Sequence, residues 1–168
     1  GGAQGVYALD VTDPVGSLSG AAFNASNVIW EFTDKDDADM GNVMGTPVFA
    51  KLLSGYDSSN QPLYKWYVIV GNGLNSNQPD GSANSNAPSV LFILSLIAVP
   101  GAAWSLNGNY WKIVTPSPST TATANGLSTP ALITQVSGAA LAAYAGDLQG
   151  NLWKFNLTGT PDTWNANA

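Results

Sequence analysis

The feature that most constrains the fold is a strand pattern that occurs three times along the chain. Each copy has aliphatic, aromatic, variable, apolar, small polar and aliphatic positions in that order, at residues 6–12, 91–97 and 152–158. Internal similarity of this kind indicates a repeat architecture, in which each unit packs against its neighbours. The chain is therefore expected to fold as a series of similar units.

Other elements recur around this pattern in a fixed order. A segment that begins with Thr-Pro and leads into an aliphatic strand ending in Gly occurs twice, at residues 46–72 and 129–147. A Trp-centred strand follows two of the aromatic strands, at residues 29–32 and 110–113, and Trp164 is placed to begin a third. The repeat therefore consists of a Thr-Pro strand, an aliphatic strand, an aromatic strand and a Trp-centred strand.

This order predicts the four-stranded antiparallel blade of a β-propeller. Strands are expected at residues 6–11, 28–32, 48–53, 65–70, 90–99, 110–114, 130–135, 139–145 and 152–157. No window of a dozen residues holds a helical apolar stripe that Gly, Pro or Asn leaves uninterrupted. The predicted fold is all-β, a partial and quinoprotein-like β-propeller of four-stranded antiparallel blades.

The repeat also divides the chain. Residues 1–33 are assigned to the outer half of one blade, residues 43–115 to one blade, and residues 127–168 to most of a third blade. Because a propeller closes with about four to eight blades, a piece of this size is expected to belong to a larger protein.

Composition removes several classes of function. The chain has no His and no Cys, which excludes Ser-His and Cys-His nucleophiles, thiolate metal sites and disulfides. Five scattered lysines and a net charge of −6 make nucleic acid an unsuitable partner. The longest apolar run, residues 90–99, is shorter than the ~20 residues of a membrane helix, so no membrane span is expected. An acidic surface without thiols is typical of extracytoplasmic proteins.

An acidic cluster follows the first Trp-centred strand. Asp34, Asp36 and Asp39 are candidate ligands for a hard cation. The alternative is a solvated loop whose aspartates cap turns. No Gly stands at a sharp-turn position and no Glu closes the loop, so the sequence favours the turn-capping interpretation.

Two glycine-containing segments resemble phosphate-binding loops only superficially. Residues 71–73 and 147–150 open no predicted helix and no Lys follows them, so both are predicted to be hairpin turns. Asp147 is accordingly assigned a structural role, with a ligand-facing position at the propeller channel as the alternative.

The tryptophans and the polar loops are the candidates for contacts with partners. Trp30, Trp111 and Trp153 stand at repeat-equivalent positions and are predicted to pack between blades. Trp104 and Trp164 lie in less regular contexts and are expected to be exposed contact aromatics. The polar loops at 74–88 and 116–126, rich in Asn, Ser, Thr and Pro, are expected to project from the rim.

Four motifs carry a resemblance to a known family. They are Gly-Val-Tyr-Ala-Leu-Asp-Val-Thr-Asp-Pro at 5–14, Ile-Trp-Glu-Phe-Thr-Asp at 29–34 with the acidic loop to Gly41, Val-Gly-Asn-Gly-Leu-Asn-Ser at 70–76, and Tyr-Ala-Gly-Asp-Leu-Gln-Gly-Asn-Leu-Trp-Lys-Phe at 144–155. The chain resembles the C-terminal propeller of the PilY/PilC family, the tip-associated adhesins of type IV pili. The resemblance implies a non-enzymatic protein at the pilus tip, on the outer membrane surface or secreted. Its implied partners are pilins or minor pilins and a host or abiotic surface.

Some members of this family regulate pilus function with calcium. The resemblance places their Asp-rich loop at the positions of Ile133, Gln135, Ser137 and Leu141 in this chain. None of these residues supplies a carboxylate, so the family calcium site is expected to be lost and no cofactor is expected.

Two alternatives remain open at the level of sequence. One is a piece of a quinoprotein dehydrogenase propeller, which would need cofactor-binding charges and usually a calcium ligand set. The other is a generic secreted binding propeller without a role in pili.

Overall fold

The computed structural model describes residues 3–16, 20, 22–76, 87–97, 102–116 and 124–167. Within these ranges the regular structure consists of β-strands and two short 3-10 turns, Ala25–Asn27 and Pro161–Thr163. No helix in the described ranges is long and apolar enough to cross a membrane. Most of the two predicted polar loops, residues 77–86 and 117–123, lies outside the described residues.

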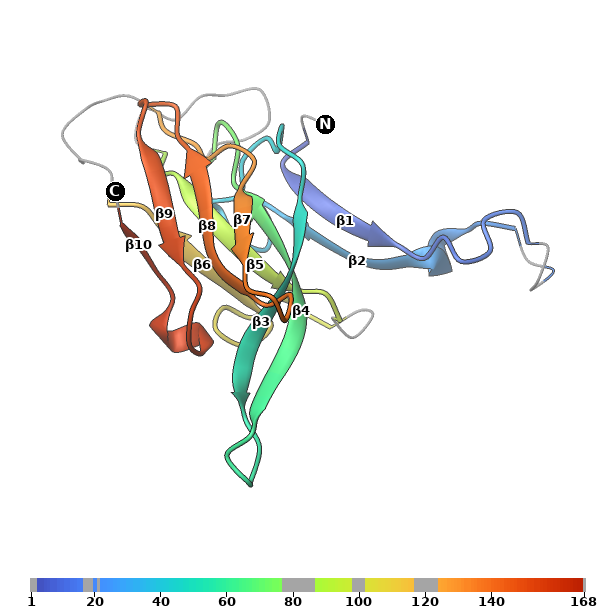
Figure 1. The fold of residues 1–168 in the computed structure, drawn as a ribbon. Helices are drawn as coiled ribbons and strands as arrows, with labels where there is room; N and C mark the ends of the chain where they lie inside the picture. The colour runs from blue at the N-terminus through green and yellow to red at the C-terminus, as the bar shows by residue number, and fades with distance from the viewer. Residues whose placement is uncertain are drawn as a thin grey trace.

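The strands form three antiparallel sheets (Figure 1). The first sheet pairs β1 (Gly5–Leu9) with β2 (Val28–Thr33). The second has the order β3 (Val48–Tyr56), β4 (Pro62–Gly71), β5 (Val90–Ser95) and β6 (Tyr110–Val114). The third contains β7 (Ala131–Thr134), β8 (Ala140–Gly146), β9 (Leu152–Asn156) and β10 (Asn165–Asn167). Both larger sheets are meanders of the kind that forms a propeller blade, which confirms the predicted fold class.

All nine predicted strands are present, and three of them differ in length from the prediction by three residues or more. β3 and β4 are longer, because their pairing continues to Tyr56 and Pro62 at the end of a hairpin. β5 ends at Ser95 instead of residue 99. The next residue, Leu96, still donates its N–H to the carbonyl of Trp66 in β4 over 3.1 Å, while its own carbonyl accepts a hydrogen bond of 3.1 Å from the indole of Trp30.

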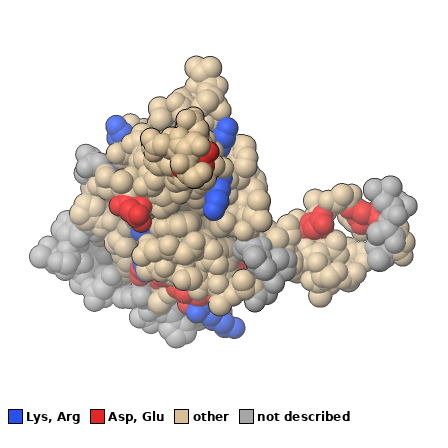
Figure 2. Space-filling model, turned by 90° about the horizontal axis from the view of Figure 1, so that it is seen from below, with Lys and Arg blue, Asp and Glu red and all other residues tan. Residues whose placement is uncertain are grey.

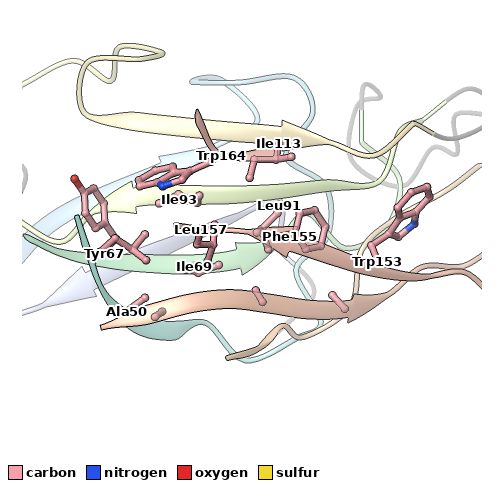
Figure 3. Close-up of a cluster of buried hydrophobic side chains, with 14 of the residues drawn as sticks. Ala50, Tyr67, Ile69, Leu91, Ile93, Ile113, Trp153, Phe155, Leu157 and Trp164 are labelled. Carbon is pink, nitrogen blue, oxygen red and sulfur yellow. The ribbon is translucent and has the colours of Figure 1, made fainter. Parts of the chain in front are cut away.

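The core consists of two clusters, one on each face of the second sheet. Alternate residues of β4 point to opposite faces, as strand geometry requires. Tyr67 and Ile69 join the cluster shared with the third sheet (Figure 3), whereas Val68 and Val70 join the cluster shared with the first sheet. β5 is buried on both faces, which explains its uninterrupted apolar sequence.

Main-chain segments cross closely where the sheets converge. The Gly41 N–H donates to the carbonyl of Asn72 over 3.0 Å, and the Gly73 N–H donates to Leu127 over 3.1 Å. A Cβ atom on Gly126 would overlap the carbonyl oxygen of Gly73. Glycine is therefore required at this crossing because the backbones approach each other directly.

Candidate interaction surface

The acidic loop after β2 joins the first sheet to the second. Asp37 is buried, and its Oδ2 accepts a hydrogen bond of 2.9 Å from the Tyr110 hydroxyl. Lys112 Nζ lies 2.8 Å from Asp37 Oδ1 and 2.7 Å from Asp39 Oδ2. Asp36 caps its own turn by accepting a hydrogen bond of 2.8 Å from the Thr33 N–H. The loop is therefore clamped to β6 by two carboxylates that share one ammonium group.

The electrostatics of this clamp agree with its geometry. Although burial acts to lower it, hydrogen bonds to Asp37 and Asp39 raise the pKa of Lys112 above its usual value. Burial, together with the hydrogen bond to Asp37, raises the pKa of Tyr110. Tyr110 and Lys112 therefore both stay protonated across the physiological range.

The candidate cation ligands of this loop are not brought together. Asp39 is paired with Lys112, Asp36 is turned toward Thr33, and the Asp34 N–H donates to the carbonyl of Gln4. Across the described ranges, no group of three His, Cys, Asp or Glu residues is placed to share a metal ion. Sequence reasoning missed Asp37, the central acid of the clamp, because its partners lie more than seventy residues away in the chain.

Residues 133–141, which stand where the family has its calcium loop, include the tight hairpin between β7 and β8. The Gln135 N–H donates to the carbonyl of Ala139 over 2.9 Å, and Gly138 takes a positive φ of 80° at the turn. No carboxylate lies between residues 133 and 141. The residues present do not fit a calcium ion, which needs about six to eight oxygen ligands.

The prediction of a hairpin turn at residues 71–73 is wrong. Gly71 is still part of β4, and Asn72 is a buried anchor between segments. Its Oδ1 accepts hydrogen bonds from the N–H groups of Val90 and Leu127 over 3.1 and 3.0 Å, and its Nδ2 donates to the Pro88 carbonyl over 3.0 Å. The physical reason is that the chain leaves β4 beside other segments, and the Asn72 side chain satisfies their backbone groups at Val90, Leu127 and Pro88.

The prediction of a turn at residues 147–150 is confirmed. The Gly150 N–H donates to the carbonyl of Asp147 over 3.2 Å, and Gly150 has a φ of 86°. Asp147 Oδ2 accepts hydrogen bonds from the Trp153 indole over 2.7 Å and from Asn125 over 3.0 Å. Although burial acts to raise it, these bonds hold the pKa of Asp147 below its usual value. Asp147 thus connects the turn to the blade interior.

The expected exposure of two tryptophans is also wrong. Trp164 is only 8% exposed and packs edge-on against Tyr67 and Trp111, each at a centroid distance of 5.8 Å. Trp104 is half-buried, and its indole N–H donates to the Glu31 carbonyl over 2.6 Å. In both cases the irregular loop folds back over the edge of a core cluster, so the indole closes that cluster.

The largest exposed aromatic surface lies on the hairpin between β3 and β4, which extends beyond the rest of the sheet (Figure 1). In β4 the residues before Tyr67 are exposed and the residues from Tyr67 onward are buried, and Tyr67 is where pairing with β5 begins. We define residues 53–66 as the projecting hairpin. Its large exposed side chains are Tyr56, Leu63, Tyr64 and Trp66, the last being 51% exposed.

A carboxylate closes the turn of the projecting hairpin, and lysines stand in and next to it. Asp57 Oδ1 accepts hydrogen bonds of 2.8 Å from the N–H groups of both Ser59 and Gln61. Lys51 Nζ lies 5.2 Å from the centroid of the Tyr64 ring. Lys51 and Lys65 are two of the five lysines of the chain. In Figure 2, which views the molecule from the side toward which the hairpin projects, lysine atoms lie on both sides of that projection.

Sequence reasoning did not identify this surface. Tyr64 and Trp66 are two residues apart, as in a strand with one buried face, and Trp66 was one of six tryptophans without a distinguishing context. The available signal was the polar Asp-Ser-Ser-Asn turn at 57–60 between two apolar arms, which indicates a hairpin.

The second sheet packs against a neighbouring sheet on each of its two faces, and main-chain segments of the sheets meet at one crossing. This arrangement is that of the β-propellers, a class of repeat proteins. The family model of the PilY1 beta-propeller domain matches residues 1–167, so the chain belongs to this family.

Individual relatives agree with this assignment. The chain is 36% identical over 167 residues to a type IV pilus biogenesis factor PilY1 homolog of Xylella fastidiosa, with 97% of this chain and 10% of that protein covered. It is 35% identical over 168 residues to the type IV pilus biogenesis factor PilY1 of Pseudomonas aeruginosa UCBPP-PA14, with 96% of this chain and 11% of that protein covered. It is also similar to the crystal structure of the Pseudomonas aeruginosa PilY1 C-terminal domain, with a TM-score of 0.66, 28% identity and coverage of 98% of this chain and 30% of that one. The chain thus spans about a tenth of the length of the two PilY1 relatives from Xylella fastidiosa and Pseudomonas aeruginosa UCBPP-PA14.

Proposed function

We propose that this chain is a non-catalytic scaffold segment of a type IV pilus biogenesis and adhesion protein that acts outside the cytoplasm. Its partners are pilins or minor pilins, and its adhesive target is a host or abiotic surface. Support comes from the relatives, which are named as type IV pilus biogenesis factors. We also propose that 1–33, 43–115 and 127–168 are the successive blade segments, and that they work without calcium or another cofactor.

One observation carries the scaffold role. Four charged groups that are at least partly buried are engaged in contacts that join strands and sheets, namely Asp37 and Asp39 with Lys112, and Asp147 with Trp153. The apolar groups that could bind a partner instead extend from the body on the projecting hairpin. This division suits a rigid body that presents a contact surface.

The test uses the full-length parent protein with the double substitution Tyr64→Ser and Trp66→Ser. We expect co-purification of minor pilins to fall about tenfold, because aromatic anchors dominate binding energy in protein interfaces. The matched control is Leu152→Ser, which removes an apolar side chain that is 65% exposed, against 51% for Trp66, from the third sheet. If co-purification of minor pilins falls equally in both variants, or falls in neither, the proposal is contradicted.

The same protein serves to test the enzyme alternative. A quinoprotein dehydrogenase would show quinone absorbance and dye-linked dehydrogenase activity, and we expect neither. Detection of either signal in the full-length protein would replace the scaffold role with a catalytic one.

A further inference from the structure

A groove of about 360 Å³ lies between the last strands of the second and third sheets. β6 and the turn before it form one wall, with Asn107, Trp111 and Ile113. The 3-10 turn Pro161–Thr163 and Trp164, which lies beside Ile113 in Figure 3, form the other. The second and third sheets each contain four strands, so both walls of this groove are built by the chain itself.

The aromatic part of the groove is held rigidly. Trp111 is half-buried and packs edge-on against Tyr67 and Trp164, at centroid distances of 5.7 and 5.8 Å. The indole N–H of Trp164 donates to the carbonyl of Gly159 over 3.2 Å, which fixes that ring in turn. A ligand that packs on these rings therefore orders no aromatic side chain on binding, and this lowers the entropic cost of binding.

Three polar groups at the groove make no hydrogen bond within the part of the chain that the structure describes. They are the side-chain amide of Asn107, the carboxylate of Asp162 and the indole N–H of Trp111. Asn107 and Asp162 are exposed. Four other tryptophans donate their indole N–H to a protein acceptor, namely Trp30, Trp104, Trp153 and Trp164. The groove thus combines a fixed aromatic wall with polar groups that are available to a ligand.

The chemistry of these groups selects a class of ligand. A carboxylate only accepts hydrogen bonds, an indole N–H only donates, and an amide does both. A matching ligand must therefore carry both donors and acceptors around a body that can pack on an aromatic ring. A sugar ring has this character, because its hydroxyl groups donate and accept and its C–H groups form an apolar face.

Charge and size exclude other small ligands. The carboxylate of Asp162 repels an anion, and the ammonium group of Lys112, which also lines the groove, is held by Asp37 and Asp39. An ammonium ligand offers no acceptor for the indole N–H of Trp111. The volume of the groove corresponds to about a dozen water molecules at ~30 Å³ each, which suits about one sugar ring.

We propose that the groove between β6 and β10 binds one neutral pyranose residue of a glycan. Trp111 supplies the surface on which the sugar ring packs, and Asp162 and Asn107 bind its hydroxyl groups. The groove contains no residue of the projecting hairpin. The proposal is therefore independent of the contact with minor pilins, and either can fail without the other.

The first experiment measures binding of neutral oligosaccharides to the full-length parent protein by calorimetry. The probes end in glucose, galactose, mannose or N-acetylglucosamine, and heparin serves as an anionic comparison. We expect at least one neutral probe to bind, and Asp162→Ala to raise its Kd about tenfold, because a hydrogen bond to a charged group is lost. The matched control is Asp34→Ala, which removes a carboxylate outside the groove and should leave this Kd unchanged.

Three results of this experiment would overturn the proposal. They are the absence of binding by all four neutral probes, an equal Kd for Asp162→Ala and Asp34→Ala, and tighter binding of heparin than of every neutral probe. Co-purification of minor pilins with Asp162→Ala should stay at the native level. Loss of both pilins and glycan in this variant would also overturn it, because the two would then share one site.

A second experiment needs no substitution. Saturation-transfer NMR of the bound oligosaccharide with the unmodified parent protein shows which sugar protons approach the protein. We expect the C–H protons on one face of one ring to receive about twice the saturation of those on the other face, because that face packs on an indole. Uniform saturation of both faces contradicts the proposed packing, even if the groove variants fail to fold.

Discussion

The two halves of β4 differ in their surroundings far more than in their sequence. Both residues 62–66 and residues 67–71 are mostly apolar and contain aromatic side chains, yet the first half is exposed and the second half is buried. The difference begins at Tyr67, where β5 starts to pair and the neighbouring sheets provide cover. Burial in this molecule is therefore decided by the neighbouring strand and sheet, and the uncovered half is the part available to a partner.

Substitution in the buried half should have the largest effect on stability. Ile69→Ala removes a fully buried side chain between the second and third sheets. We expect the free energy of unfolding to fall by about 3 kcal/mol, through lost transfer energy and the cavity that remains. Urea denaturation of the parent propeller domain measures this, and a loss below about 1 kcal/mol would contradict the assigned packing.

Removal of the central carboxylate of the clamp should have the next largest effect. Asp37→Ala leaves the Tyr110 hydroxyl without its acceptor and takes one of two carboxylates from Lys112. We expect a loss of about 2 kcal/mol in the free energy of unfolding, because the partners remain partly buried. Asp34→Asn is the control, since it removes a charge from the same loop without touching Lys112. Equal losses in the two variants would show that the clamp does not join the sheets.

The lowered pKa of Asp147 predicts that the free energy of unfolding depends on pH. Its pKa is lowered in the folded protein, so the folded state binds fewer protons than the unfolded state near that pKa. Its contribution is complete above the unfolded pKa of about 3.9 and is lost as pH falls through the lowered folded value. The stability difference between the native protein and Asp147→Asn should therefore shrink below about pH 4 in urea titrations. If the stability difference between the native protein and Asp147→Asn instead grows as the pH falls, the predicted direction is wrong.

Substitution in the exposed half of β4 should change stability little. We expect Tyr64→Ser to alter the free energy of unfolding by no more than about 0.5 kcal/mol, because it touches no core cluster. Thermal and urea denaturation of the variant measure this. A loss comparable to that of Ile69→Ala would mean that the projecting hairpin is packed against another part of the protein.

Chelation of metal ions should have the smallest effect on the stability of this segment. Because the hairpin at residues 133–141 offers no carboxylate, addition of EDTA should leave the melting temperature of this segment unchanged to within about 1 °C. Calorimetry with and without added calcium measures this. A reproducible downward shift on chelation would restore a cation site, with the acidic loop as its first candidate.

The regular part of the fold was predictable because strands and turns leave local signals. Alternating or continuous apolar runs bounded by turn residues located all nine predicted strands, and the repeat gave their order. β10 was predicted only as a Trp-centred strand that Trp164 begins, without its bounds, and the strand is Asn165–Asn167. It is three residues long, contains no Val, Ile or aromatic residue, and forms only because β9 offers an edge.

The contacts between segments were less predictable, because no local pattern encodes them. Asn72 was taken for a turn residue, since Gly-Asn-Gly has turn composition, yet it anchors segments distant in sequence. Trp164 was expected to be exposed, yet the preceding 3-10 turn carries it onto Tyr67. Asp37 and Trp66 could not be distinguished from their neighbours, because their burial or exposure depends on where strands β5 and β6 begin and end.

Hydrogen exchange along β4 in the full-length parent protein tests the central claim most directly. If the sheets provide the cover and the hairpin is left free, the amides of residues 67–71 should exchange about a hundredfold more slowly than those of residues 63–66, which open locally. Uniform slow exchange from residue 63 to residue 71 would contradict this account, because the projecting hairpin would then be covered and unavailable to a partner.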